Sequence, residues 1–139
     1  MTLMLKTAER LIAASEAKAR EFGINVTTAV VDSAGFIVQM RRMDGTRPMT
    51  THIAHSKAYT GAIMKRPARD LLHWAESEPV YFASVAQMGH VAIVATQGGM
   101  PVRPGSEIIG GIGVSGGTPD QDQACCEAAL AAIEATWQK

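Results

Sequence analysis

The chain has 139 residues, of which 47% are hydrophobic and 19% are charged, a composition typical of one compact domain with a substantial core. Thirteen basic residues balance thirteen acidic ones, so the sequence lacks the basic surplus that nucleic-acid binding normally needs. No apolar run approaches the roughly 20 residues of a membrane span, and the N-terminus shows no signal-peptide core. We therefore expect a single domain over residues 1–139 that binds neither nucleic acid nor membrane.

The first predicted element is a helix from about Lys6 to Phe22, which stops at Gly23. Residues at helical spacing form its apolar stripe: Ala8, Leu11, Ile12, Ser15, Ala19 and Phe22. The charged residues lie largely outside that stripe: Glu9, Arg10, Glu16, Lys18 and Arg20. The pattern predicts a helix that packs on the rest of the domain.

A β-hairpin is predicted next, with strands over 24–31 and 36–43 around the turn 32–35. Neither face of the first strand is distinctly polar, which is typical of a strand that is covered on both sides. In a chain this small, helices can cover one face while a second subunit covers part of the other. The hairpin, and a composition that is both apolar and neutral, therefore predict a homo-oligomer.

The middle of the chain is predicted to be helical. A helix over 49–65 is rich in small residues, which allow another backbone to approach closely, and a shorter helix begins at Pro67 and runs to about Trp74 or Ala75. We expect the segment 76–89 to be a long excursion, because it holds Pro79 and only scattered aromatic residues. Excursions of this length are often functional or interfacial.

Strands are predicted again at 91–96, at about 100–102 and at 107–114, before a last helix over 119–137. Strands grouped on either side of a helical middle favour an antiparallel α+β sheet. The last helix carries the adjacent pair Cys125 and Cys126, whose side chains diverge by about 100° and cannot easily bridge. We interpret them as buried small hydrophobic residues in a cytoplasmic protein rather than as metal ligands.

The most informative segment is the glycine-rich strand and turn over 107–118. Three glycines interrupt a β-branched strand, which usually reflects a close backbone approach, a bulge or a ligand: Gly110, Gly111 and Gly113. Thr118 is a predicted N-cap with Pro119 at the first helical position and Gln121 as its capping-box partner. Free N–H groups at this helix start could hold an anion, or the turn could be a tight connection without a ligand.

These segments carry a family resemblance that extends over nearly the whole chain. The run 110–122, GGIGVSGGTPDQD, resembles the C-terminal signature of the GlcG/HbpS family of haem-binding or haem-degrading domains, which also occurs at the C-terminus of PduO-type proteins. Four further pieces resemble motifs of this family in the same order: AVVDSAG at 29–35, RMDG at 42–45, AHSKA at 54–58 and GGMPV at 98–102. The resemblance implies a five-stranded antiparallel sheet of profilin-like type in a three-layer arrangement with flanking helices. It also implies dimer-based assemblies and a haem ligand.

Candidate site residues lie in the second helix and at the end of the hairpin. His52 and His55 are three residues apart, so both reach the same side of the helix, where either could be an axial haem ligand or a general base. No third ligand follows at a recognisable spacing, and we therefore predict no metal site. Because the first helix and the hairpin hold no histidine, an imidazole ligand must come from position 52 onward. His73 and His90 have no supporting neighbours and are set aside.

Arg42 and Lys57 match the arginine and the lysine of the family motifs. Arg41 and Arg42 point to opposite faces of the sheet, so only one of them can enter a given pocket. Lys57 could bind a carboxylate or a phosphate, or it could pair with Asp32 or Asp44 and tie the helix to the hairpin.

Together these residues predict a pocket for an anionic ligand beside the sheet. The predicted ligand-binding residues are Arg42, His52, His55, Lys57, Gly111, Gly113, Ser115, Gly116 and Gly117. The leading hypothesis is a small homo-oligomeric protein that binds haem or another tetrapyrrole. The alternatives are an enzyme of a catabolic pathway acting on a small organic acid, and an accessory subunit of a partner enzyme.

Overall fold

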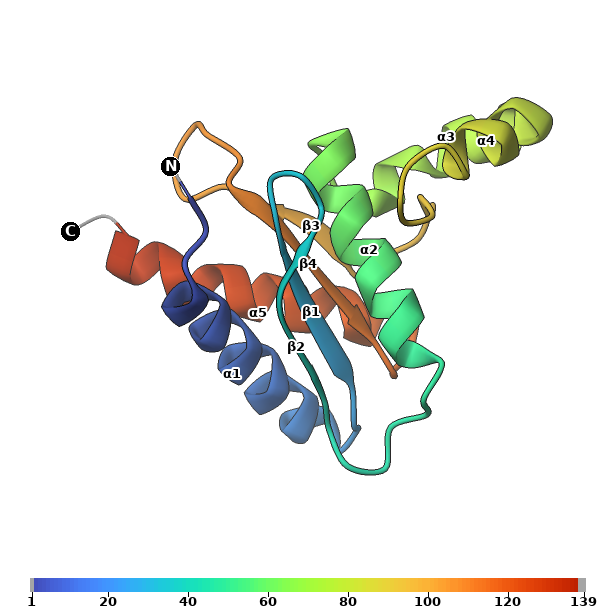
Figure 1. Cartoon of the computed structure of the whole chain (residues 1–139). Coiled ribbons are helices and arrows are strands. Elements are labelled where there is room, and N and C mark those ends of the chain that lie inside the picture. The colour runs from blue at the N-terminus through green and yellow to red at the C-terminus, as the bar shows by residue number, and fades with distance from the viewer. Residues whose placement is uncertain (1, 138–139) are drawn as a thin grey trace.

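The protein is a three-layer α+β domain, described by a computed structural model that covers residues 2–137 (Figure 1). Two long helices, α1 (Leu5–Phe22) and α5 (Pro119–Trp137), pack side by side on one face of the sheet. The helix α2 (Thr50–Met64) covers the other face. Their positions agree with the three long helices that the sequence predicts. Over the described residues, no helix is long and apolar enough to cross a membrane.

The sheet is antiparallel throughout. Its strands are β1 (Thr27–Asp32), β2 (Ile37–Arg42), β3 (Gly99–Val102) and β4 (Gly110–Ser115). They lie in the order β2-β1-β4-β3, so that the two central strands are the buried β1 and the glycine-rich β4. The register between β1 and β2 shifts between Val30 and Val31, which marks a bulge. The prediction of an antiparallel α+β fold is confirmed.

The expected fifth strand is absent between residues 2 and 137, where the sheet has four strands. The segment 91–96, predicted as a strand, is irregular because its amide groups bond elsewhere. The N–H of Ile93 donates to the carbonyl of Ala86, and the N–H of Val94 donates to the hydroxyl of Thr60, both over 3.0 Å. The apolar residues of segment 91–96 predict that the segment is buried. It is buried against helices and does not pair with another strand of the sheet.

The segment that follows α2 forms an arm that projects from the domain (Figure 1). It contains the 3-10 helix η1 (Ala68–Leu71), then α3 (Leu72–Ser77) and α4 (Pro79–Ala86). The segment 76–89, expected to be a long excursion, does lie in this projecting arm, but most of it is helical. Pro79 begins α4 at the first helical position, where its missing N–H breaks no intrahelical bond. Four buried side chains hold the arm against α2: Tyr59, Leu71, Ala86 and Ile93.

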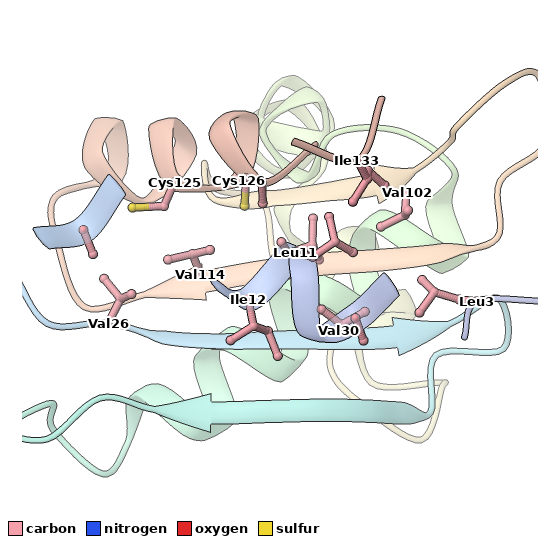
Figure 2. Close-up of a cluster of buried hydrophobic side chains, with 14 of the residues drawn as sticks. Leu3, Leu11, Ile12, Val26, Val30, Val102, Val114, Cys125, Cys126 and Ile133 are labelled. Atoms are coloured by element: carbon pink, nitrogen blue, oxygen red, sulfur yellow. The ribbon is translucent and has the colours of Figure 1, made fainter. Parts of the chain in front are cut away.

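The main core lies between the sheet and the α1–α5 pair (Figure 2). It is built from inward side chains of the sheet and of the two helices, including Leu11, Ile12, Val30, Val114, Cys126 and Ile133. The predicted stripe of α1 is buried here except for Phe22, which is 39% exposed. Glu16, expected outside the stripe, is buried because its carboxylate accepts a hydrogen bond from Arg41 over 2.8 Å. The core under α2 is thinner and rich in alanine.

Candidate functional site

Two of the predicted site glycines, Gly111 and Gly113, lie directly beneath α2. A Cβ atom on Gly111 would lie 2.1 Å from the carbonyl oxygen of Ala58, and one on Gly113 would lie 2.1 Å from that of Ala54. Both distances are far shorter than a real contact, so any side chain would push the helix off the sheet. The missing side chains of Gly111 and Gly113 therefore allow close packing of α2, which is one of the three explanations that the sequence left open.

The turn after β4 satisfies its own polar groups. The N–H of Gln121 donates to the hydroxyl of Thr118 over 3.2 Å, and the N–H of Thr118 donates to Oε1 of Gln121 over 3.0 Å. This is the predicted capping box. The N–H of Gly117 donates to the Asp122 carboxylate over 2.9 Å. Because these donors are used internally, the turn offers few free N–H groups to an anion.

Lys57 forms a buried ion pair with Asp122. Its ammonium lies 3.0 Å from the carboxylate and also donates to the carbonyl of Val114 over 2.9 Å, and both side chains are about 95% buried. The pair joins α2, β4 and α5. The predicted alternatives, Asp32 and Asp44, are wrong as partners, since the Asp32 carboxylate accepts the N–H groups of its own turn. Asp122, in the first turn of α5, is therefore the partner of Lys57 that the sequence did not indicate.

Arg42 lies on the same side of the sheet as α2. It is paired in register with Thr27, whose hydroxyl lies 2.7 Å from the hydroxyl of Thr50 in α2. Its neighbour Arg41 lies on the opposite side, where it binds Glu16 of α1. The two arginines therefore point to opposite faces, as predicted. The exposed Arg42 and the histidines of α2 share one side of the edge strand β2.

Two histidines meet at the hairpin turn. Nε2 of His55 lies 3.4 Å from the carbonyl oxygen of Gly35, and Nε2 of His90 lies 3.3 Å from the same oxygen. The ring of Phe36 stacks on His90 with centroids 4.2 Å apart. The sequence gives no signal for His90 because 55 residues separate it from Gly35. His52, one turn before His55, is exposed and has no hydrogen-bond partner among residues 2–137.

A small cavity of about 260 Å³ lies beside the turn that follows β4. It is lined by Ile24, Asn25, Gly45, Thr46, Arg47, Thr50 and Gly116. The hydroxyl of Thr46 is buried and has no hydrogen-bond partner in the described part of the chain. Of the predicted site residues, only Gly116 enters this cavity, while Ser115 is buried at the end of β4 opposite Thr27. A second, shallow polar hollow of about 370 Å³ is lined by both Arg41 and Arg42. The prediction that only one of these arginines can enter a given pocket is therefore wrong, because the two long side chains reach the same hollow from opposite faces of the strand end.

The two cysteines are buried free thiols, as predicted. Burial, reinforced by the nearby Asp122 carboxylate, raises the pKa of Cys125 to about 11. Burial also raises the pKa of Cys126, whose thiol donates to the carbonyl of Gly98 over 3.1 Å. Across the described chain, no three His, Cys, Asp or Glu side chains are grouped so that they could hold a metal ion.

Comparison with known proteins places this geometry in a family. Residues 3–131 match the family described as haem degrading protein HbpS-like. The chain belongs to the HbpS-like family. An uncharacterized 15.0 kDa protein from the dhaT-dhaS intergenic region of Citrobacter freundii is 32% identical over 130 residues, which are 93% of this chain and 90% of that protein.

Solved structures of this HbpS-like fold agree with the assignment. The crystal structure of the Klebsiella pneumoniae protein ORFY is similar with a TM-score of 0.89 and 30% identity, over 97% of this chain and 92% of that one. The crystal structure of a PduOC–haem complex is similar with a TM-score of 0.85 and 27% identity, over 96% of each chain. The family resemblance expected from the motifs is confirmed.

Proposed function

We propose that this protein binds haem or a related tetrapyrrole. The observation that carries the proposal is the similarity to the PduOC–haem complex, which extends over 96% of both chains. Likeness over the whole domain, and not over a single motif, supports a shared mode of ligand binding. The geometry of this chain adds an exposed surface whose chemistry suits such a ligand.

That surface is the side of β2 that faces α2. Because β2 is an edge strand and α2 lies mainly over β1 and β4, the α2 side of β2 is only partly covered: Ile37 is 44% exposed and Met40 is half-buried. Arg42 continues the same row, on the evidence of its pairing with Thr27. A haem is a flat apolar ring with two carboxylates, so it fits an apolar strip that ends in a guanidinium group.

The iron ligand comes from the flank of α2 beside this strip. Residues 52 and 55 lie about 60° apart around the helix: His55 reaches the hairpin at Gly35, and His52 lies further round on the exposed side of α2. His55 already contacts the carbonyl of Gly35, whereas His52 can bind iron without giving up a hydrogen bond that the structure shows. We therefore assign His52 as the axial ligand, with His55 beside the ring.

Titration of the apo-protein with haemin tests this assignment through the Soret band. The wild-type protein is expected to show a saturable shift with one haem per chain. His52→Ala should abolish the shifted band, Arg42→Gln should weaken binding, and His73→Ala, a distant exposed histidine, should leave binding unchanged. A weak, non-saturating change that is the same in all four proteins would refute haem binding at this surface.

A second function, binding of a small organic acid, is favoured by the cavity beside Gly116. It combines the cationic Arg47 with the unpartnered hydroxyl of Thr46, and a carboxylate would satisfy both groups. A panel of small carboxylates should then raise the unfolding temperature of the wild-type protein and not that of Arg47→Gln. Equal stabilisation of both proteins would show that the cavity is not the site.

We also infer that the chain assembles with copies of itself. The arm carries exposed apolar side chains at Val80 (81%), Tyr81 (59%) and Met88 (75%), and exposed apolar groups gathered in this way mark protein contacts. Light scattering after size exclusion should give a multiple of 14.8 kDa, and Val80→Lys/Tyr81→Glu should shift it toward the monomer. A monomeric wild-type protein at micromolar concentration would contradict this inference.

A further inference from the structure

A third cavity lies at the opposite end of α2 from His52, where β3 and the later turns of α5 meet the loop after α2. Its volume is about 350 Å³, which is within the range of sites for small ligands. The apolar part of its lining comes from β3, α5 and the flanking loops: Pro67, Met100, Pro101, Pro104, Leu130 and Ile133. None of the residues assigned to haem takes part in it.

The rim of this cavity is cationic. Lys65, Arg66 and Arg103 stand against a single carboxylate, Glu134, so the charged lining carries three positive groups and one negative group. All three cations are exposed, and none has an acidic partner within 4 Å in the described chain. An apolar floor with unpaired cations at its mouth is complementary to a molecule with an apolar body and an anionic end.

The walls of the cavity are held in place before any ligand arrives. Gly61 allows the last turn of α2 to rest on β3, since a Cβ there would lie 2.5 Å from the carbonyl oxygen of Met100. Pro67, Pro101 and Pro104 have fixed φ angles. Lys65 ends α2 with φ 59° and ψ 33°, and no other non-glycine residue in the described chain has a positive φ. Glycine is the usual residue at such a position, so the lysine is kept at a conformational cost.

We propose that this cavity binds a small amphipathic anion, a carboxylate or phosphate joined to an apolar group, independently of the haem surface. The apolar group lies on Met100, Leu130 and the prolines, and the anionic group meets Lys65 and Arg103 at the mouth. The competing interpretation is that the three cations are merely solvated and that Lys65 only ends a helix. Glycine at position 65 relieves the backbone strain and removes the cation. The proposal therefore expects Lys65→Gly to weaken anion binding, whereas the competing interpretation expects binding to stay unchanged.

The test uses 8-anilinonaphthalene-1-sulfonate as the amphipathic anion and N-phenyl-1-naphthylamine as its uncharged counterpart. Fluorescence titration should show saturable binding of the sulfonate, one per chain. Its affinity should fall at least tenfold in Lys65→Gly and in Arg103→Gln, while the affinity of the uncharged probe changes less than threefold. Octanoate should displace the sulfonate, and octanol should do so much less well.

Matched variants keep the result interpretable. Lys65→Gly should unfold at the same temperature as the wild type or higher, so a loss of binding cannot be attributed to unfolding. Lys6→Gln removes an exposed cation that does not line the cavity, and His52→Ala removes the proposed iron ligand; both should bind the sulfonate like the wild type. Sulfonate binding that is non-saturating, absent, or unchanged in Lys65→Gly and Arg103→Gln would overturn the proposal.

Discussion

Removing one member of the Lys57–Asp122 pair should destabilise the protein strongly. In Lys57→Met the side chain keeps its length, and the carboxylate of Asp122 stays buried with only the Gly117 N–H as a donor at 2.9 Å. Because both groups are about 95% buried, solvent cannot compensate, and the expected loss in the free energy of unfolding is about 3–5 kcal/mol. For a chain of this length the unfolding temperature should fall by about 10 °C or more.

Urea denaturation of four proteins measures this effect and its origin. The wild type, Lys57→Met, Asp122→Asn and the double variant form a cycle, and Lys6→Met is the control for loss of an exposed lysine. If the pair acts as a unit, the double variant should lose less stability than the sum of the single variants, with a coupling of roughly 1–3 kcal/mol. Additive losses below about 1 kcal/mol each would refute the reasoning, because the pair would then not be buried in solution.

Three further predictions concern local structure. Gly113→Ala should destabilise by about 1–3 kcal/mol because its Cβ would meet the backbone of α2, whereas Gly105→Ala, with nothing within 4 Å, should change the urea midpoint little. Thr118→Ala should cost about 1 kcal/mol through loss of the N-cap in the same assay. Because the pKa of Cys125 is raised from 9.0 to about 11, the folded state holds its thiol proton longer than the unfolded state. The contribution of the Cys125 thiol to the free energy of unfolding is complete below pH 9 and declines up to about pH 11. In Cys125→Ala the free energy of unfolding should therefore decrease less steeply between pH 9 and pH 11 than in the wild type. A native protein whose two thiols react with iodoacetamide at pH 8 as fast as the unfolded chain would contradict this burial.

Local features of the fold were predictable from the sequence, and long-range ones were not. The capping box involves residues three apart, so its geometry follows from the helix start alone. The three glycines were compatible with a close approach, a bulge or a ligand, and they did not indicate what approaches. Gly111 and Gly113 lie against α2, some 50 residues earlier in the chain, whereas a Cβ on Gly110 would meet the carbonyl of Val31 in β1. The expected strand over 91–96 failed because its apolar pattern is equally compatible with burial against α2 and α4.

In the candidate site, too, local features were predictable from the sequence and long-range contacts were not. The opposite orientations of Arg41 and Arg42 follow from the strand period of two, and the structure confirms them. The partner of Lys57 is 65 residues away, and nothing in the sequence ranks Asp122 above Asp32 or Asp44. His90 joins the hairpin only through the fold, because an irregular segment after α4 brings it to Gly35. Pairings of this kind are fixed by tertiary packing, which periodicity does not encode.

The most direct test of haem binding on the α2 side of β2 is to locate the bound iron by NMR. Ferric haem broadens backbone resonances near the metal, so one equivalent of haemin should remove amide signals around His52, His55 and residues 37–42. Signals from the central turns of α5, on the other side of the sheet, should persist. Broadening centred on α5 or on the cavity at Lys65 and Arg103, or weak broadening spread over the whole surface, would contradict the account.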